Sequence, residues 1–433
     1  MTAAVSSPAP GPSPAARITS RGALFGLSVL TLINLLNYLD RYIVAGVMPK
    51  VLEAFHLRKE EGGLLGTVFI LVYMVASPLA GVLGDRVPRR FVIAAGVFVW
   101  SLATIFSGLA PSFALLLVAR GIIGVGEAGY GTVAPAVISD LFPRELRTRM
   151  LSFFYVAIPV GAAAGYALGG WIGSTWSWQA AFFVGGAPGL LLSIATLFMK
   201  EPARGAMDEA GAAAPKIAFL EGLKGLGRNA VFWPTTVGYT LMTFSIGGLS
   251  YWMPTFLEQE RSMDPGLAGF AFGAVTALAG LSGTVVGGLL GDWADRRAAG
   301  GGLRLSAVGL VAAAPFMFFA ARVSSATSIF ALTFVAQFLL FLNSGPINAA
   351  IVNCVPSNFR AFAMGLNVLF IHLLGDAISP PLIGLVGERR TLAFAIEVNA
   401  LPVLLGGVAL FFAARAALRH LPQVTARPAT PRG

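Results

Sequence analysis

The chain has very few of the residues that build disulfide frameworks and metal sites. Cys354 is its single cysteine and its histidines are His56, His372 and His420, so we expect no intramolecular disulfide and no metal cluster. The nucleotide-binding pattern G-x-x-x-x-G-K-[ST] is absent from the sequence, and so is a recognisable nucleophile–base pair. These absences argue against an enzyme and against a machine driven by ATP hydrolysis.

Charge is also scarce. Charged residues make up 12% of the 433 positions, whereas about 25% is usual in soluble proteins. Hydrophobic residues make up 56% and the mean hydropathy is +0.77, which favours lipid as the surrounding medium. The net charge of +10 could indicate nucleic-acid binding. We expect no nucleic-acid partner, because the basic residues fall in short loops between apolar runs and form no continuous stripe.

What the chain does have is a series of long apolar runs. A bilayer core of about 30 Å requires about 20 apolar residues in a helix. By that measure the sequence predicts an all-α integral membrane protein with twelve transmembrane helices, six on each side of a polar stretch. The predicted helices cover about 23–49, 63–84, 91–109, 113–139, 150–171 and 179–199, and then 230–257, 266–290, 305–322, 327–353, 361–386 and 392–415.

The same pattern predicts five parts and an orientation. Loops on one side of the membrane hold about 21 Lys and Arg residues and those on the other side about 7, which places both termini in the cytoplasm. We expect the protein in the cell (inner) membrane. The run from Leu24 is too long for a signal peptide and lacks a cleavage site. The expected parts are a disordered cytoplasmic tail at 1–22, six-helix bundles at 23–199 and 230–415, an inter-bundle cytoplasmic loop at 200–229 and a cytoplasmic tail at 416–433.

The two halves repeat a motif. "GVLGDRVPRR" (Gly81–Arg90) follows the second predicted helix, and "GGLLGDWADRR" (Gly287–Arg297) follows the eighth. A repeated six-helix unit is typical of transporters that hold substrate between two bundles near the midplane.

These motifs, with "ARGIIGVGEAGYGTVAPAVISDLF", "GAAAGYALGG" and "KEPARG", resemble the major facilitator superfamily over about 23–415. More narrowly, "NYLDRYIVAGVMP", "GEAGY" and "HLLGDAISP" (His372–Pro380) resemble its Spinster branch. The resemblance implies two pseudo-symmetric bundles and secondary active transport by alternating access. It also implies an amphipathic, lipid-like cargo such as a lysolipid or sphingosine-1-phosphate, with no cofactor other than a proton gradient.

Four charged residues fall inside the first and fourth predicted helices: Asp40, Arg41, Arg120 and Glu127. A charge at bilayer depth costs at least ~2.5–3.5 kcal/mol and is therefore a candidate functional group with a partner. At 1.5 Å per residue, Asp40 and Arg120 lie at similar depths, so an Asp40–Arg120 or an Arg41–Glu127 contact is possible. Neighbours on a helix point about 100° apart, so Asp40 and Arg41 should face different partners across a central cavity.

Two roles are open for each pair of charges. Burial disfavours a charged carboxylate whereas a nearby arginine favours it, so Asp40 and Glu127 are candidate proton-coupling sites; the alternative is a permanent ion pair that only holds helices together. Arg41 and Arg120 are candidate ligands for a phosphorylated or zwitterionic headgroup, because a guanidinium binds phosphate bidentately. The alternative is that they only neutralise buried carboxylates.

Further polar and aromatic residues are candidates for lining the cavity, although each could equally serve helix packing. His372 and Asp376 stand at i,i+4, so that they could tune each other's protonation or steady a kinked helix. The other candidate substrate-binding residues are Asn37, Tyr130, Tyr239, Thr243, Trp252, Asn343 and Asn348.

The repeated motif has a gating interpretation. Gly81 would permit close helix packing, and the charges after it would form a cytoplasmic latch; the alternative is simple positive-inside anchoring. The gating candidates are Gly81, Asp85, Arg86, Arg89 and Arg90 in the first half, with Asp295 and Arg296 in the second.

Two other functions remain open: a multidrug or organic-anion exporter on the same scaffold, and a membrane sensor that transports nothing. Membrane lipids and an amphipathic small molecule are the expected partners. One chain holds both bundles, so we expect a monomer.

Overall fold

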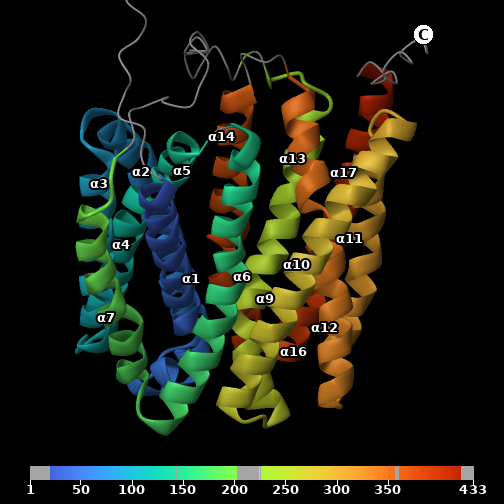
Figure 1. Ribbon diagram of the computed structural model, residues 1–433. Coiled ribbons are helices and arrows are strands. Elements are labelled where there is room, and N and C mark those ends of the chain that lie inside the picture. The colour runs from blue at the N-terminus through green and yellow to red at the C-terminus, as the bar shows by residue number, and fades with distance from the viewer. Residues whose placement is uncertain (1–19, 143, 202–223, 225, 356–359, 421–433) are drawn as a thin grey trace, which may run out of the picture.

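The computed structural model describes residues 20–142, 144–201, 224, 226–355 and 360–420, and the regular elements in these ranges are all helical (Figure 1). The first half contains α1 (Ser20–Phe55), α2 (Lys59–Arg86), α3 (Arg89–Gly108), α4 (Phe113–Gly131), α5 (Ala134–Leu141), α6 (Arg144–Thr175) and α7 (Trp178–Leu197). The second half contains α9 (Phe232–Arg261), α10 (Pro265–Arg297), α11 (Gly301–Ala320), α12 (Ala326–Phe341), α13 (Ser344–Asn353), α14 (Arg360–Phe370), η2 (Ile371–Asp376), α15 (Ser379–Arg389), α16 (Leu392–Val398) and α17 (Ala400–His420).

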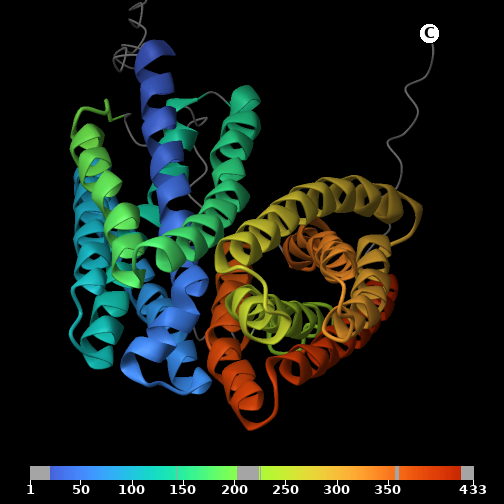
Figure 2. The same ribbon diagram turned by 90° about the horizontal axis from the view of Figure 1, so that it is seen from below.

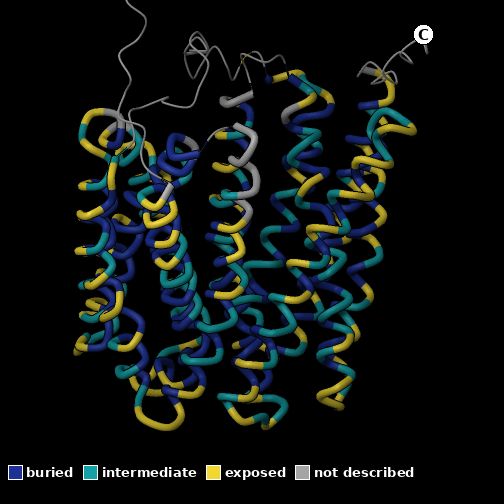
Figure 3. Tube along the Cα trace, viewed as in Figure 1, coloured by how far each residue is buried: buried dark blue, intermediate teal, exposed yellow. Residues whose placement is uncertain are grey.

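These elements form twelve membrane-crossing helices, as the sequence predicts. Within the described residues, eleven segments are long and apolar enough to cross a bilayer, and the 30-residue α9 is the twelfth. Threonine, serine and terminal charged residues lower the hydropathy of α9. Exposed positions lie on the outward faces of the helices (Figure 3), and many are large and apolar, such as Leu191, Phe198 and Val308. Such side chains are expected against lipid.

An even number of crossings brings the two ends of the helical region to one side. In Figure 1, α1 begins and α17 ends at the same end of the molecule. We call this end, which holds Ser20 and His420, the terminal face. The other end, which holds Phe55 and Lys59 where α1 passes into α2, is the opposite face.

The fourth helix of each half is broken at a matching place, which the sequence analysis did not predict. The first half divides into α4 and α5 after Gly131, and the second divides into α12 and α13 after Phe341. Pro135 and Pro346 follow these breaks. A proline has no N–H and leaves the carbonyl four residues earlier without its helical donor, here at Gly131 and Leu342.

The eleventh crossing is also interrupted. Between α14 and α15 the chain forms the π-helical turn η2, and Ser379, Pro380 and Pro381 begin the next helix. A π-turn widens the helix by one residue per turn and is frequent at functional sites. The predicted continuous helix over 361–386 is therefore three segments.

The two halves form separate groups of helices that meet along one seam (Figure 2). In this seam α2 packs against α15 and η2, α6 packs against α10, and α1 packs against α9. The closest approaches lie near the opposite face. A Cβ added to Gly63 would lie 2.5 Å from the Pro381 nitrogen, and one on Gly170 would lie 2.3 Å from the Pro265 oxygen. The halves are therefore in tight contact at the opposite face.

Candidate functional site

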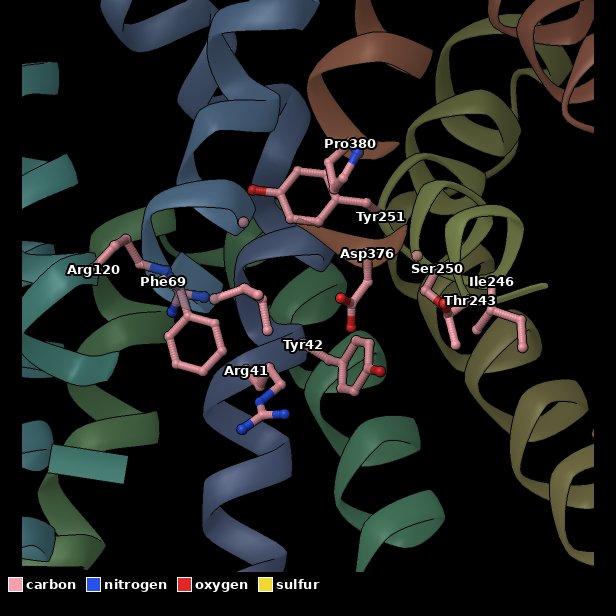
Figure 4. A pocket seen from close by; sticks show the side chains of 13 residues that line it. Arg41, Tyr42, Phe69, Arg120, Thr243, Ile246, Ser250, Tyr251, Asp376 and Pro380 are labelled. Carbon is pink, nitrogen blue, oxygen red and sulfur yellow. The ribbon is translucent and has the colours of Figure 1, made fainter. Parts of the chain in front are cut away.

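A cavity of about 150 Å³ lies between the two halves (Figure 4). Both halves contribute charge to it: Arg41 and Arg120 from the first half, and Asp376 from the second. Its other lining residues are Tyr42, Gly66, Phe69, Ile70, Thr243, Ile246, Gly247, Ser250, Tyr251 and Pro380. A space of this size is smaller than the ~300–1,000 Å³ of pockets that enclose drug-sized ligands. It can hold a polar headgroup but not a whole lipid.

Arg41 is held on both sides. Its Nη2 atom lies 2.6 Å from Oε2 of the fully buried Glu127 on α4. Its guanidinium carbon lies 4.8–5.6 Å from the ring centres of Tyr38, Phe69 and Tyr73. Of the two contacts that the helix depths allowed, the Arg41–Glu127 contact is thus present. Aromatic faces attract cations, so the rings fix the guanidinium at the cavity wall.

Arg120 has no ion-pair partner comparable to Glu127 among the described residues. The residue is 1% exposed, and its Nε and Nη1 atoms are buried without a hydrogen-bond acceptor. Its guanidinium carbon lies 5.1 Å from the centre of the Phe69 ring. Among the described residues no carboxylate lies within 4 Å of Arg120, so the other possible contact, with Asp40, is not formed. Asp40 attracts Arg120 electrostatically without contacting it, so the guanidinium keeps buried N–H groups that an incoming anion could bind.

Asp40 points away from the cavity. Its Oδ2 atom accepts a hydrogen bond of 2.8 Å from Thr104 on α3, and its Oδ1 atom is buried without a donor. A Cβ built on Gly185 of α7 would lie 3.8 Å from Asp40 Oδ1, so this carboxylate also faces α7. Asp40 and Arg41 therefore do face different partners, as predicted. The expectation that both face a central cavity is wrong, because the helix turn sends Asp40 into the interior of the first half.

On the second half, Asp376 and His372 form the predicted i,i+4 pair. The His372 Nδ1 atom lies 3.0 Å from Asp376 Oδ2. Thr243 on α9 donates to the Ile371 carbonyl at 3.1 Å and so ties η2 to α9. Of these residues, Thr243 and Asp376 line the cavity.

The remaining substrate-binding candidates are not among the residues that line this cavity. The Tyr130 hydroxyl donates to the Leu30 carbonyl inside the first half, and the Trp252 indole donates to the Pro380 carbonyl. Both side chains are buried, so their positions favour the packing alternative.

The asparagine candidates lie in several separate places. Asn348 contacts the Tyr239 hydroxyl at 3.4 Å, and Asn343 donates to carbonyls at the end of α12. Asn37 is buried with its Nδ2 atom unpartnered.

The predicted latch is largely held within its own half. Arg89 pairs with Asp140 of α5 at 2.5 Å, and its backbone N–H donates to Glu201. Arg86 is exposed, and Arg90 lies over the Phe91 ring. The side chain of Asp85 lies outside the described residues.

The structure also describes the glycine of the predicted latch and its counterpart in the second half. The close packing expected at Gly81 is not seen among the described residues, since none of their atoms from a neighbouring helix lies within 4 Å of a Cβ built there. A Cβ on Gly84 would instead meet Val133. In the second half, Asp295 accepts the Gly302 N–H at 2.7 Å and so caps α11, while Arg296 is exposed.

The sequence analysis missed Tyr42, Phe69 and Ser250 as lining residues. Phe69 and Ser250 are ordinary residues in long apolar or mixed runs, and no sequence signal separates them from packing residues. Tyr42 follows Asp40 and Arg41 directly, so the helix position next to the charged pair was the available signal.

Comparison with known proteins assigns the fold and the family. The sequence model of the Major Facilitator Superfamily matches residues 30–380. The chain is 36% identical over 430 residues to human "Protein spinster homolog 1", covering 90% of this chain and 80% of that protein. It is 35% identical over 397 residues to "Protein spinster" of Drosophila melanogaster, a match that covers 88% of this chain and 65% of the fly protein.

Solved structures show the same architecture. A bacterial homolog of the human lysosomal transporter Spinster, in an inward-facing and unoccupied conformation, superposes with a TM-score of 0.85 over 94% of this chain and 100% of that one, at 23% identity. The inward-facing, occupied form gives a TM-score of 0.80 over 96% of this chain and 100% of that one, at 22% identity. With the family match and the shared fold, the chain belongs to the Spinster family of major facilitator superfamily transporters.

Proposed function

We propose that this transporter moves an amphipathic, lipid-like solute with an anionic headgroup, of the lysolipid or sphingosine-1-phosphate type, by alternating access coupled to protons. We further propose that it works as a monomer in the cell (inner) membrane, with the terminal face in the cytoplasm. The single observation that carries the cargo proposal is Arg120, a buried cavity-wall guanidinium with no ion-pair partner within 4 Å among the described residues.

A phosphate would supply the missing charge. Guanidinium groups bind phosphate bidentately and stay charged at bilayer depth. The cavity volume of about 150 Å³ suits a headgroup. Phe69, Ile70 and Ile246 form an apolar part of the cavity wall, on which the start of an acyl chain can lie. The rest of the chain would extend beyond this cavity.

Proton coupling would use the two buried carboxylates. Asp40 Oδ1 and Glu127 Oε1 are each buried without a donor, so each has a position where an added proton could reside. An anion bound at Arg120 would change the electrostatic surroundings of both carboxylates, which lie on the same helices as the two arginines. Cargo binding and protonation would then influence each other.

Reconstitution tests the proposal. Purified protein in liposomes should move fluorescent lysophosphatidate across the bilayer, faster with a pH gradient than without one. Arg120→Gln should reduce transport at least tenfold, while Arg419→Gln, a change at an exposed arginine in the last turn of α17, should not. Equal transport by Arg120→Gln and the unchanged protein would refute the cargo proposal.

The same assay separates the alternatives. An organic-anion exporter would prefer a short hydrophilic anion to the lysolipid. Arg120 attracts both compounds, but a lipid transporter would prefer the lysolipid because its acyl chain adds apolar contact. A sensor would bind without moving either compound.

A further inference from the structure

One backbone carbonyl next to the cavity wall, that of Ala377, has lost its helical donors to two prolines. The Ala377 oxygen would normally accept from an N–H three to five residues ahead. Positions 380 and 381 are prolines, which have no N–H, and the N–H of Leu382 donates to the Ile378 oxygen at 3.3 Å. Ala377 is fully buried, so its carbonyl needs a partner from within the protein.

The partner comes from the other half of the molecule. Thr67 on α2 donates its hydroxyl to the Ala377 oxygen at 2.5 Å. Thr67 lies one helical turn after Gly63, on the face where α2 touches the backbone of Pro380 and Pro381. The hydroxyl therefore reaches the end of η2 at a point where the two halves are in backbone contact.

Other contacts join the halves nearby, but they hold different segments. The Tyr251 hydroxyl of α9 donates to the Gly62 carbonyl at 3.1 Å, and Lys59 pairs with Glu388 at 3.5 Å near the opposite face. Thr67 is distinguished by its acceptor, since Ala377 directly follows Asp376, the acidic residue of the cavity wall.

We propose that Thr67 is a positioning residue that holds the π-helical turn, and with it Asp376, at the cavity wall while the opposite face is closed. When the halves part at that face, the Ala377 carbonyl loses its donor. Closure of the opposite face and the position of Asp376 are thus linked by one hydrogen bond. The proposal rests on the rocking of the halves in the proposed function.

Removal of the hydroxyl tests the link without any substrate. Spin labels are placed at Ala54→Cys and Arg389→Cys, exposed positions on different halves at the opposite face, in a Cys354→Ser background. Pulsed electron resonance then gives the distance distribution in liposomes. Thr67→Val should raise the ratio of separated to closed molecules roughly two- to tenfold, the range expected for one lost hydrogen bond. Thr67→Ser should leave the ratio unchanged, and Thr67→Ala replaces valine if valine does not fit.

A second substitution gives the test its specificity. Pro381→Ala restores an N–H four residues after Ala377, so the carbonyl regains a donor in its own helix. In that background Thr67→Val should change the ratio of separated to closed molecules by less than twofold. An unchanged distribution in Thr67→Val, or an equally large change with Pro381→Ala present, would overturn the proposal. Failure to transport lysolipid would instead refute the proposed cargo and leave these distances interpretable.

Discussion

Arg41 and Arg120 lie on the same aromatic ring. Their guanidinium carbons are 4.8 Å and 5.1 Å from the centre of Phe69, and both side chains line the cavity between the halves. Two like charges this near would repel, but the ring attracts both and Glu127 neutralises one. The cavity wall thus keeps one positive charge in excess on its first-half side.

Phe69→Leu should destabilise the first half. It removes a shared cation–π contact, which is worth ~0.5–2 kcal/mol for each cation depending on desolvation. Thermal unfolding in detergent should therefore occur at a lower temperature than for Phe69→Tyr, which keeps a ring in place. Equal unfolding temperatures for the leucine and tyrosine variants would show that the cation–π contact adds no stability.

Glu127→Gln should leave the half-buried Arg41 without its ion-pair partner. Breaking one side of a fully buried pair costs about 3–5 kcal/mol, and the partial exposure of Arg41 should reduce this cost, so the variant should be destabilised by less than that. Adding Arg41→Gln removes the orphaned charge and should recover much of the loss. Denaturation of the single and double variants measures both changes, and no recovery in the double variant would contradict the pairing.

Asp40→Asn should separate proton coupling from transport itself. The amide keeps the shape and can still accept from Thr104, but it cannot take up a proton at Oδ1. Accumulation driven by a pH gradient should fall at least tenfold, while exchange of cargo at equal pH on both sides continues. A full pH-driven response in Asp40→Asn and in Glu127→Gln together would refute coupling through these carboxylates.

Gly165→Ala should destabilise the packing of α1 on α6. A Cβ there would lie 2.4 Å from the Leu39 oxygen, so the helices must move apart, at a cost of about 1–3 kcal/mol. Gly81→Ala is the matched control, because no neighbouring helix of the described residues comes within 4 Å of its Cβ. If both variants unfold at the same temperature, the close approach of α1 and α6 is not a source of stability.

Cys354 should react slowly with thiol reagents. Burial raises the pKa of its thiol to about 11, and the sulfur donates to the Ile351 carbonyl. Since only the thiolate is nucleophilic, roughly one thiol in a thousand is reactive at pH 8. Maleimide labelling should be far slower than at Ala54→Cys in the Cys354→Ser background, and should accelerate as pH approaches 11. Equal rates at pH 7 would contradict the shielded environment.

The sequence predicts the twelve crossings and the buried charges well, because both follow from hydropathy and from the cost of charge in lipid. It also limits the contacts of Arg41 and Arg120 to two options, since depth along a helix follows from residue number. It cannot choose between those options or orient Asp40, because rotation about a helix axis depends on how α1 packs on α3 and α6. The glycines of α6 set that rotation through backbone contacts.

The helix interruptions were harder to predict. Pro135, Pro346 and Pro381 are visible in the sequence, but prolines also occur inside intact helices here, for example Pro49 of α1 and Pro159 of α6. Whether a proline bends or divides a helix depends on whether a neighbour satisfies the freed carbonyl. The Thr67–Ala377 bond is such a case, and its two residues are 310 positions apart.

Asp40 points away from the cavity that would hold the cargo, and it accepts a hydrogen bond from Thr104 instead. A bound cargo would therefore not contact Asp40, and its direct influence on the protonation of Asp40 would be electrostatic. A cargo without net negative charge would have little electrostatic effect on Asp40. Any transport of such a cargo should therefore be independent of the proton gradient.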